Sequence, residues 1–162
     1  MTLSERLSEY VRACFAGIWV QSFEHDDVIA EIARLCRQRS WSLATWDVDG
    51  GLAVAGRENG AGTSTPTGAA DPLAAIKAAG SLAAPGGTAL VVMRNLHRFL
   101  GSIEVVQAMD TALAAGKQDR TIVVILSPIL QLPAELERQF AVLEHDLPGR
   151  DQLGQIARSI AT

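Results

Sequence analysis

The chain has 162 residues, of which 48% are hydrophobic and 20% are charged, so it can bury a substantial core in one domain and is not wholly disordered. Its formal net charge of −4, from 18 acidic and 14 basic residues, argues against a dedicated nucleic-acid-binding protein. The longest apolar runs, 89–93 and 122–126, are far too short to cross a bilayer.

The first residues and the cysteines indicate a cellular compartment. Glu5 and Glu9 flank Arg6, and no apolar stretch of signal-peptide length follows them. This start differs from a secretory signal, so we expect a cytoplasmic protein without membrane association. Cys14 and Cys36 are expected to be buried, reduced thiols rather than a disulfide.

The N-terminal part of the chain alternates between helix-like and strand-like patterns. The residues from 26 to 39 place acidic side chains in the first turn of a helix and basic side chains in its last turn, which suits the helix dipole. In order, the pattern predicts an opening helix after a Thr2–Glu5 capping pair, a strand over 17–22, a helix over 26–39, a strand over 41–46 and a turn over 49–51.

The alternation continues to the end of the chain. The pattern predicts a long loop over 56–70, then a helix from Asp71–Pro72 to about Ala84 and a strand over 88–93. A helix from Ser102 to Gly116, a strand over 121–126, a short helix over 133–140 and a strand over 142–146 are expected to follow. The last predicted element is a helix over 151–160, with Leu153, Ile156 and Ile160 facing inward. Strands separated by helices indicate a parallel sheet with helices on both faces. We therefore predict a single α/β domain over 1–162, built as a three-layer sandwich.

Ligands of such sheets bind beyond the carboxyl ends of the strands, which here are residues 22–27, 94–98 and 127–128. A phosphate site after the first strand needs glycines, so that backbone amides can surround the phosphate. The sequence has three carboxylates there instead, in the segment Phe23-Glu-His-Asp-Asp27. These residues predict a self-capped helix start rather than an anion site.

The remaining candidate residues do not form a known catalytic pattern. Asn95 follows the third predicted strand, where an ATPase would place an aspartate for magnesium. His97 and Arg98 are expected to lie in a solvated loop. The three histidines have no partners at metal-ligand spacing, and Ser127 lacks the flanking glycines of a hydrolase nucleophile. We therefore predict no catalytic residue and no metal site.

Several segments, taken in order, cover nearly the whole chain and carry a resemblance. They are Gly17-Ile-Trp-Val-Gln-Ser-Phe-Glu-His25, Trp46 before a glycine turn, Asp71-Pro-Leu73, Leu90-Val-Val-Met-Arg-Asn-Leu-His-Arg-Phe-Leu100, Ile122-Val-Val-Ile-Leu-Ser127, Leu132-Pro-Ala-Glu-Leu-Glu137 and Asp146-Leu-Pro148. The chain resembles the N-terminal, degenerate ATPase-like domain of AAA-family ATPases of the chloroplast-reading-frame type. This resemblance implies a P-loop NTPase-like sheet of five parallel strands in the order 5-1-4-3-2.

The resemblance also implies roles for individual residues. Asn95 would occupy a vestigial Walker B position and Ser127 a vestigial sensor position, and the Walker A loop is missing. The domain itself would need no cofactor, because ATP and magnesium would belong to an active AAA module later in the same polypeptide. We expect that module to be the partner, in a hexamer-type ring, with Arg94, Arg98 and Arg138 as the candidate interface. The chain alone is not expected to be an enzyme.

Two other functions remain open on the sequence. A receiver-like signalling domain also has acids after its first strand, here Asp26 and Asp27, and a Ser or Thr after its fourth. Asn95, however, replaces its phosphoacceptor aspartate. A weak nucleotide-binding enzyme with an unconventional loop is the other alternative. The strand order distinguishes the receiver-like domain from the AAA-type domain. A receiver places its first strand between its second and third strands, whereas the AAA order places the first strand between the fourth and fifth.

Overall fold

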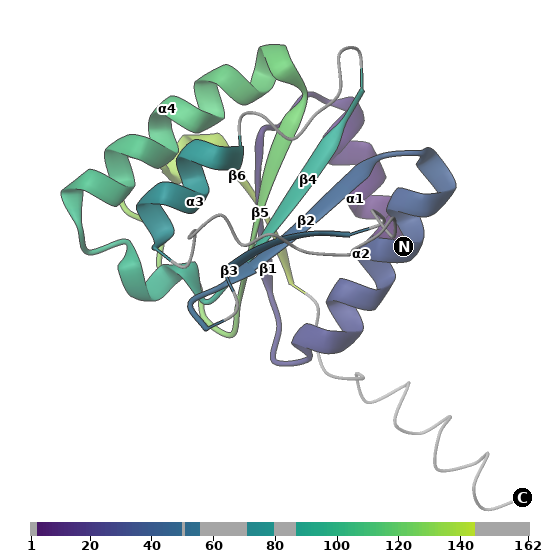
Figure 1. The fold of residues 1–162 in the computed structure, drawn as a ribbon, viewed down its shortest axis with the longest axis horizontal. Helices are drawn as coiled ribbons and strands as arrows, with labels where there is room; N and C mark the ends of the chain where they lie inside the picture. The colour runs from purple at the N-terminus through teal and green to yellow at the C-terminus, as the bar shows by residue number, and fades with distance from the viewer. Residues whose placement is uncertain (1–2, 50, 56–70, 80–86, 145–162) are drawn as a thin grey trace, which may run out of the picture.

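The computed structural model describes residues 3–49, 51–55, 71–79 and 87–144, and Figure 1 shows their arrangement. The helices are α1 (Leu3–Arg12), α2 (His25–Arg39), α3 (Pro72–Ala79) and α4 (Ile103–Asp119), with two short 3-10 helices, η1 (Leu96–Phe99) and η2 (Glu137–Gln139). The strands are β1 (Gly17–Gln21), β2 (Ser42–Asp47), β3 (Gly51–Ala55), β4 (Ala89–Arg94), β5 (Thr121–Ser127) and β6 (Phe140–Glu144). The expected α/β class is confirmed.

The strands form one mixed sheet of six, in the order β3-β2-β4-β5-β1-β6. The expectation of five strands, all parallel, is wrong, because β3 adds an antiparallel edge strand next to β2. The full order therefore differs from the expected one by β3, while the other five strands are parallel and run β6-β1-β5-β4-β2. Since β1 lies between β5 and β6, this order also opposes the receiver-like alternative.

A tight hairpin explains the additional strand. The carboxylate of Asp47 accepts a hydrogen bond from the backbone N–H of Asp49 at 2.9 Å, and Gly51 adopts a φ of 72°. A short aspartate turn and a left-handed glycine reverse the chain within a few residues. The turn over 49–51 was expected, but the short, alanine-containing segment after it was not recognised as a strand.

Both faces of the sheet are covered, as a three-layer sandwich requires. Neighbouring residues of β4 point to opposite faces: Val92 packs in the core under α1 and α2, whereas Val91 packs in the core under α3 and α4. The same alternation places Val124 and Val123 of β5 in different cores. Burial on both faces is the reason why the central parallel strands are continuous apolar runs.

Three further expectations need correction. The short helix expected over 133–140 consists of turns and the three-residue η2, because Leu136 and Gln139 donate to carbonyls three residues back. The helix expected to end at Gly116 continues to Asp119, and Arg120 closes it in a left-handed conformation with its N–H on the carbonyl of Gly116. Cys36 is buried, but Cys14, which follows α1, is exposed.

Some predicted elements lie outside the described residues. They are the loop over 56–70, the end of the third helix beyond Ala79, the strand residues after Glu144 and the helix over 151–160. In the part of the chain that is described, no helix has the length and apolar character needed to cross a membrane.

Replacing Gly116 with alanine should destabilise the fold, although alanine is the better helix former by about 1 kcal/mol. A Cβ at Gly116 would lie 2.3 Å from the backbone carbonyl oxygen of Thr121, and neither backbone can move freely. We expect Gly116→Ala to lower the free energy of unfolding in urea by about 1–3 kcal/mol. Gly101→Ala is the matched control, because a Cβ there meets nothing within 4 Å. Equal stability of the two variants would contradict this packing.

Candidate functional site

The carboxyl edge of the sheet brings together the three segments in which ligand-binding residues were expected. The N–H of Ser22, after β1, donates to the carbonyl of Ser127 at the end of β5, with a nitrogen–oxygen distance of 2.9 Å. The N–H of Asn95, after β4, donates to the carbonyl of Leu126 at 2.8 Å. These backbone bonds extend the pairing of three neighbouring strands by one step and fix the positions of the loops that follow.

The turn between β1 and α2 has only three residues, Ser22 to Glu24. Within it, the N–H of Glu24 donates to the hydroxyl of Ser22 at 2.9 Å, so this amide already has a partner. Asp26 and Asp27 follow in the exposed first turn of α2. A bound phosphate would meet carboxylates here instead of a glycine-rich loop of free amides.

Asn95 has a structural explanation that does not involve magnesium. It adopts a left-handed backbone conformation with φ of 58° and ψ of 27°, and its side chain is exposed. Asparagine tolerates this conformation better than most residues with a side chain. At the turn from β4 into η1, the backbone therefore accounts for this asparagine.

A buried serine–histidine pair lies next to Asn95. The Oγ of Ser127 is 2.9 Å from Nδ1 of His97, and both side chains are buried, with His97 only 6% exposed. The expectation that His97 lies in a solvated loop is wrong. The segment after β4 forms η1, whose residues Leu96 and Phe99 pack against the core under α3 and α4 and carry His97 inward. The apolar spacing of Leu96, Phe99 and Leu100 was the sequence signal for this packing.

The hydroxyl of Ser127 is fully used by local hydrogen bonds. It donates to the carbonyl of Ile129 at 2.8 Å and accepts from the N–H of Ile129 at 3.2 Å. A serine hydroxyl has one proton, so with that proton on Ile129 the remaining bond requires Nδ1 of His97 to be the donor. In this arrangement Ser127 orders the loop after β5 and is not poised as a nucleophile.

The pKa values of the two histidines near this edge are both lowered. Burial lowers the pKa of His97, and the positive charge of Arg98 and the nearby His25 act in the same direction. Burial also lowers the pKa of His25, with a further contribution from Arg94, while a hydrogen bond to Ser22 and the charge of Asp26 oppose the change. Sequence reasoning did not bring these histidines together, because they lie 72 positions apart and meet only through the parallel sheet.

The three arginines of the expected interface do not share one edge. Arg94 ends β4 and Arg98 lies in η1, both at the carboxyl edge. Arg138 precedes β6, whose first residue Phe140 pairs with Gly17 at the start of β1. It therefore lies at the opposite, amino edge, and the expectation that it joins the other two is wrong. The expected helix over 133–140 had concealed where β6 begins.

The described residues offer little to hold a metal ion. Within them, no three histidine, cysteine, aspartate or glutamate side chains are grouped closely enough to act as joint ligands. Arg94 and Asp26 form an ion pair with a nitrogen–oxygen distance of 3.8 Å, and Asp26 is 95% exposed. Such a solvated pair contributes little to stability and can exchange partners easily.

Comparison with known proteins gives the family. The family model described as "SpoVK-like AAA ATPase, N-terminal domain" matches residues 3–145. The chain belongs to this family, and the expectation of an N-terminal domain of an AAA ATPase is confirmed. The comparison with curated proteins found no match.

Among solved structures, a chain of the "Structure of Drosophila ORC bound to DNA" aligns with a TM-score of 0.47 and 12% sequence identity. The alignment covers 89% of this chain and 41% of that one, so this chain spans less than half the length of that relative.

Replacing Ser127 with alanine should destabilise the domain. The change removes the acceptor for the buried Nδ1 of His97 and for the N–H of Ile129, which are then left unpaired. We expect a loss of about 1–3 kcal/mol in the free energy of unfolding, measured by urea titration. Ser102→Ala is the control, because Ser102 is exposed and its side chain makes no capping hydrogen bond. A loss no larger than that of the control would show that the pair is unimportant.

Stability should fall as the pH is lowered through the range of the histidines. The folded state disfavours the proton on His97, because its pKa is lowered there, so below the ordinary value of 6.5 the unfolded chain binds more protons. The free energy of unfolding should therefore be smaller at about pH 5.5 than at about pH 7.5, and His97→Gln should reduce this difference. His25→Gln measures the share of the second histidine. A His97→Gln protein that kept the full pH dependence would refute this account.

Proposed function

We propose that this chain is a non-catalytic docking module of an AAA ATPase of the chloroplast-reading-frame type. The carboxyl edge of its sheet is the docking surface, and its partner is the ATPase module of the same polypeptide. In this proposal ATP and magnesium are bound by that partner, the full-length protein assembles into a hexamer-type ring in the cytoplasm, and this domain needs no cofactor.

The position of the exposed apolar side chains is the observation that carries the proposal. Among the described residues, every large hydrophobic side chain that is exposed follows the carboxyl end of a parallel strand. These side chains are Phe23 after β1, Val48 after β2, Ile103 beyond β4 and η1, and Ile129 and Leu130 after β5. Scattered exposed leucines are ordinary, but apolar residues collected at one edge and surrounded by charges are typical of a protein–protein interface.

The charges around these side chains suit a partner with carboxylates. Arg94 is one-third exposed and forms a long ion pair with the exposed Asp26, while Arg98 is exposed. Arginine forms forked hydrogen bonds with carboxylates across interfaces, at less desolvation cost than lysine. Because the ion pair with Asp26 is solvated, Arg94 would give up little stabilisation if it left Asp26 to pair with a carboxylate of the partner.

Three features of the same edge support a role without catalysis. The turn after β1 is short and acidic, the residue after β4 is a neutral asparagine, and the hydroxyl of Ser127 is engaged in the loop after β5. An ATPase would use these three places for the phosphate loop, the magnesium carboxylate and the phosphate sensor. A domain that lacks these groups can still keep the shape through which such modules associate.

The test compares assembly of the full-length polypeptide with that of variants, by light scattering with and without ATP. Phe23→Ser and a double change of Arg94 and Arg98 to alanine should each weaken assembly by about tenfold or more, since central interface residues often contribute over 1 kcal/mol. Arg138→Ala is the control, because it removes an exposed arginine from the opposite edge. The arginine effect should diminish as the salt concentration rises.

Two results would overturn the proposal. Equal assembly of all variants across salt concentrations would show that this edge is not the interface. A saturable heat on titrating Mg-ATP into this chain alone, with a micromolar dissociation constant, would favour the weak nucleotide-binding alternative instead.

A further inference from the structure

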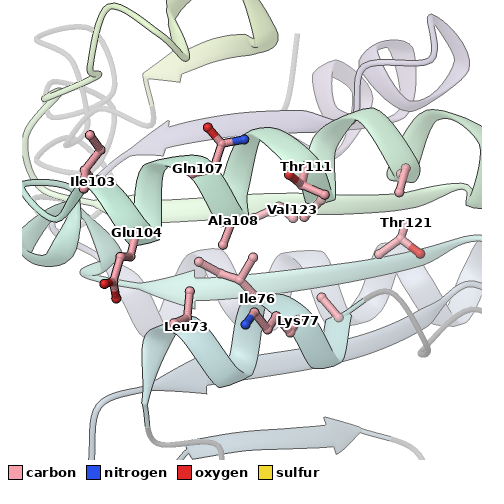
Figure 2. A pocket seen from close by; sticks show the side chains of 14 residues that line it. Leu73, Ile76, Lys77, Ile103, Glu104, Gln107, Ala108, Thr111, Thr121 and Val123 are labelled. Atoms are coloured by element: carbon pink, nitrogen blue, oxygen red, sulfur yellow. The ribbon is translucent and has the colours of Figure 1, made fainter.

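A groove of about 920 Å³ runs between α3 and α4, on the flank of the domain (Figure 2). Leu73 and Ile76 of α3 form one wall, and Ala108 and Ala112 of α4 form the other. Val123 of β5 also lines it. The groove thus exposes a mostly apolar surface between two helices, and contiguous apolar surface of this kind is typical of an interaction site.

The charges of the groove are balanced across its two walls. Only two of the 14 residues that line it are ionisable: Lys77 on the α3 wall and Glu104 on the α4 wall. Both side chains are exposed, and neither forms an ion pair within the described part of the chain. A surface that carries the same two opposite charges in exchanged positions would complement this groove, and a second copy of the chain presents such a surface.

The two helices that form the walls run in the same direction. Pro72 in the first turn of α3 and Ser102 at the start of α4 line one further hollow, so both helices begin at the carboxyl edge of the sheet. Glu104 is the second residue of α4 and Lys77 the sixth of α3, which separates them by about 6 Å along the helix direction. The long, flexible side chain of a lysine can bridge that offset.

We propose that a second copy of this chain covers the groove, through a two-fold symmetric contact between the faces formed by α3 and α4. A two-fold axis along the groove sets α3 of one copy against α4 of the other. Lys77 of each copy then faces the wall that carries Glu104 in the other copy. The contact therefore gains two ion pairs, and no like charges of the lining are brought together.

This arrangement follows the usual physics of symmetric contacts between helices. In an isologous interface the same patch serves on both copies, so the patch must complement itself, as the two charges do here. Two helices packed face to face on two others form a four-helix layer, which buries the apolar surface between each pair. The small side chains of Ala108 and Ala112 allow the helices of the two copies to approach closely.

The size of this face sets the strength of the contact. The eight residues of α3 cover about 12 Å and the 17 residues of α4 about 25 Å. With a helix diameter of about 10 Å, the face measures about 400 Å² per copy, half of the roughly 800 Å² that a standard interface buries on each partner. We therefore expect a weak dimer that forms at high protein concentration.

The contact goes beyond the docking of an ATPase module at the carboxyl edge, because it joins two copies of this domain through the flank. Ile103, at the start of α4, belongs to both surfaces: it lines the groove and is 82% exposed. The test therefore leaves Ile103 unchanged and uses only residues that belong to one of the two surfaces.

The test measures the mass of the 162-residue chain in solution by analytical ultracentrifugation, from about 10 µM to about 500 µM. The mass should rise with concentration from that of one chain toward that of two. Lys77→Glu and Glu104→Lys should each weaken the dimer by about tenfold or more, because each change places like charges together at both symmetry-related contacts. The double variant Lys77→Glu/Glu104→Lys should restore the dimer to within about threefold, which an unfolded variant could not do.

Two controls make the result specific to the groove. Lys117→Glu makes the same change of charge at an exposed residue of α4 that does not line the groove, and it should leave the dimer unchanged. Phe23→Ser, which tests the carboxyl edge, should also leave the dimer unchanged, so the two proposals can fail separately.

A chain that stays monomeric at every concentration would overturn the proposal, and would assign the groove to another segment or to a different protein. A dimer that both single charge reversals leave intact would place the contact elsewhere on the surface. A dimer that the double variant does not restore would refute the reciprocal pairing of Lys77 with Glu104.

Discussion

The backbone pairing of β5 with its two neighbours determines most of what this domain can present to a partner. All seven residues of β5 are buried, and it pairs in parallel with β1 on one side and β4 on the other. The bonds from Ser22 to Ser127 and from Asn95 to Leu126 continue this pairing beyond the regular strands. The loops that follow three strands are therefore held in fixed relation, and their side chains form one surface rather than three mobile segments.

At that surface the buried polar groups hold the loops in place through hydrogen bonds. Ser127 joins His97 to the loop at Ile129, and the carbonyl of Ile129 also accepts the indole N–H of Trp19 at 3.2 Å. Trp19 is itself fully buried in β1. The loop after β5 is thus hydrogen-bonded to η1, within its own turn and to the neighbouring strand β1. Such connected networks favour a single conformation, which an interface needs as much as a catalytic site does.

The sequence predicted the fold well wherever a pattern had a single physical cause. Alternation of apolar strands and amphipathic helices located the parallel strands, because burial on both faces leaves a continuous apolar run. The prediction failed where a structural feature depends on contacts with other parts of the fold. The strand β3 is stabilised by its hairpin with β2, and its five residues carry little signal alone. His97 is polar by type but buried by the packing of Leu96 and Phe99.

The arginines show the same limit at the candidate site. Arg94 and Arg98 were placed correctly, because they follow a strand whose direction was clear. Arg138 was misplaced because the segment before β6 looks helical, whereas the chain makes tight turns there. No local pattern reports which edge of a sheet a loop lies on. That information comes from the direction of the neighbouring strand, and the start of β6 was expected two residues late.

The order of the strands also bears on how the chain is made. β1 begins at residue 17, but its two neighbours in the sheet, β5 and β6, begin only at residues 121 and 140. Ribosomes add roughly 5–20 residues per second, so β1 waits on the order of ten seconds for its first neighbour. During that time Ile18, Trp19 and Val20 have no sheet to join. A nascent chain of this design therefore carries a strand with a fully buried centre unpaired during this interval, and it is then that chaperones would have the most to offer.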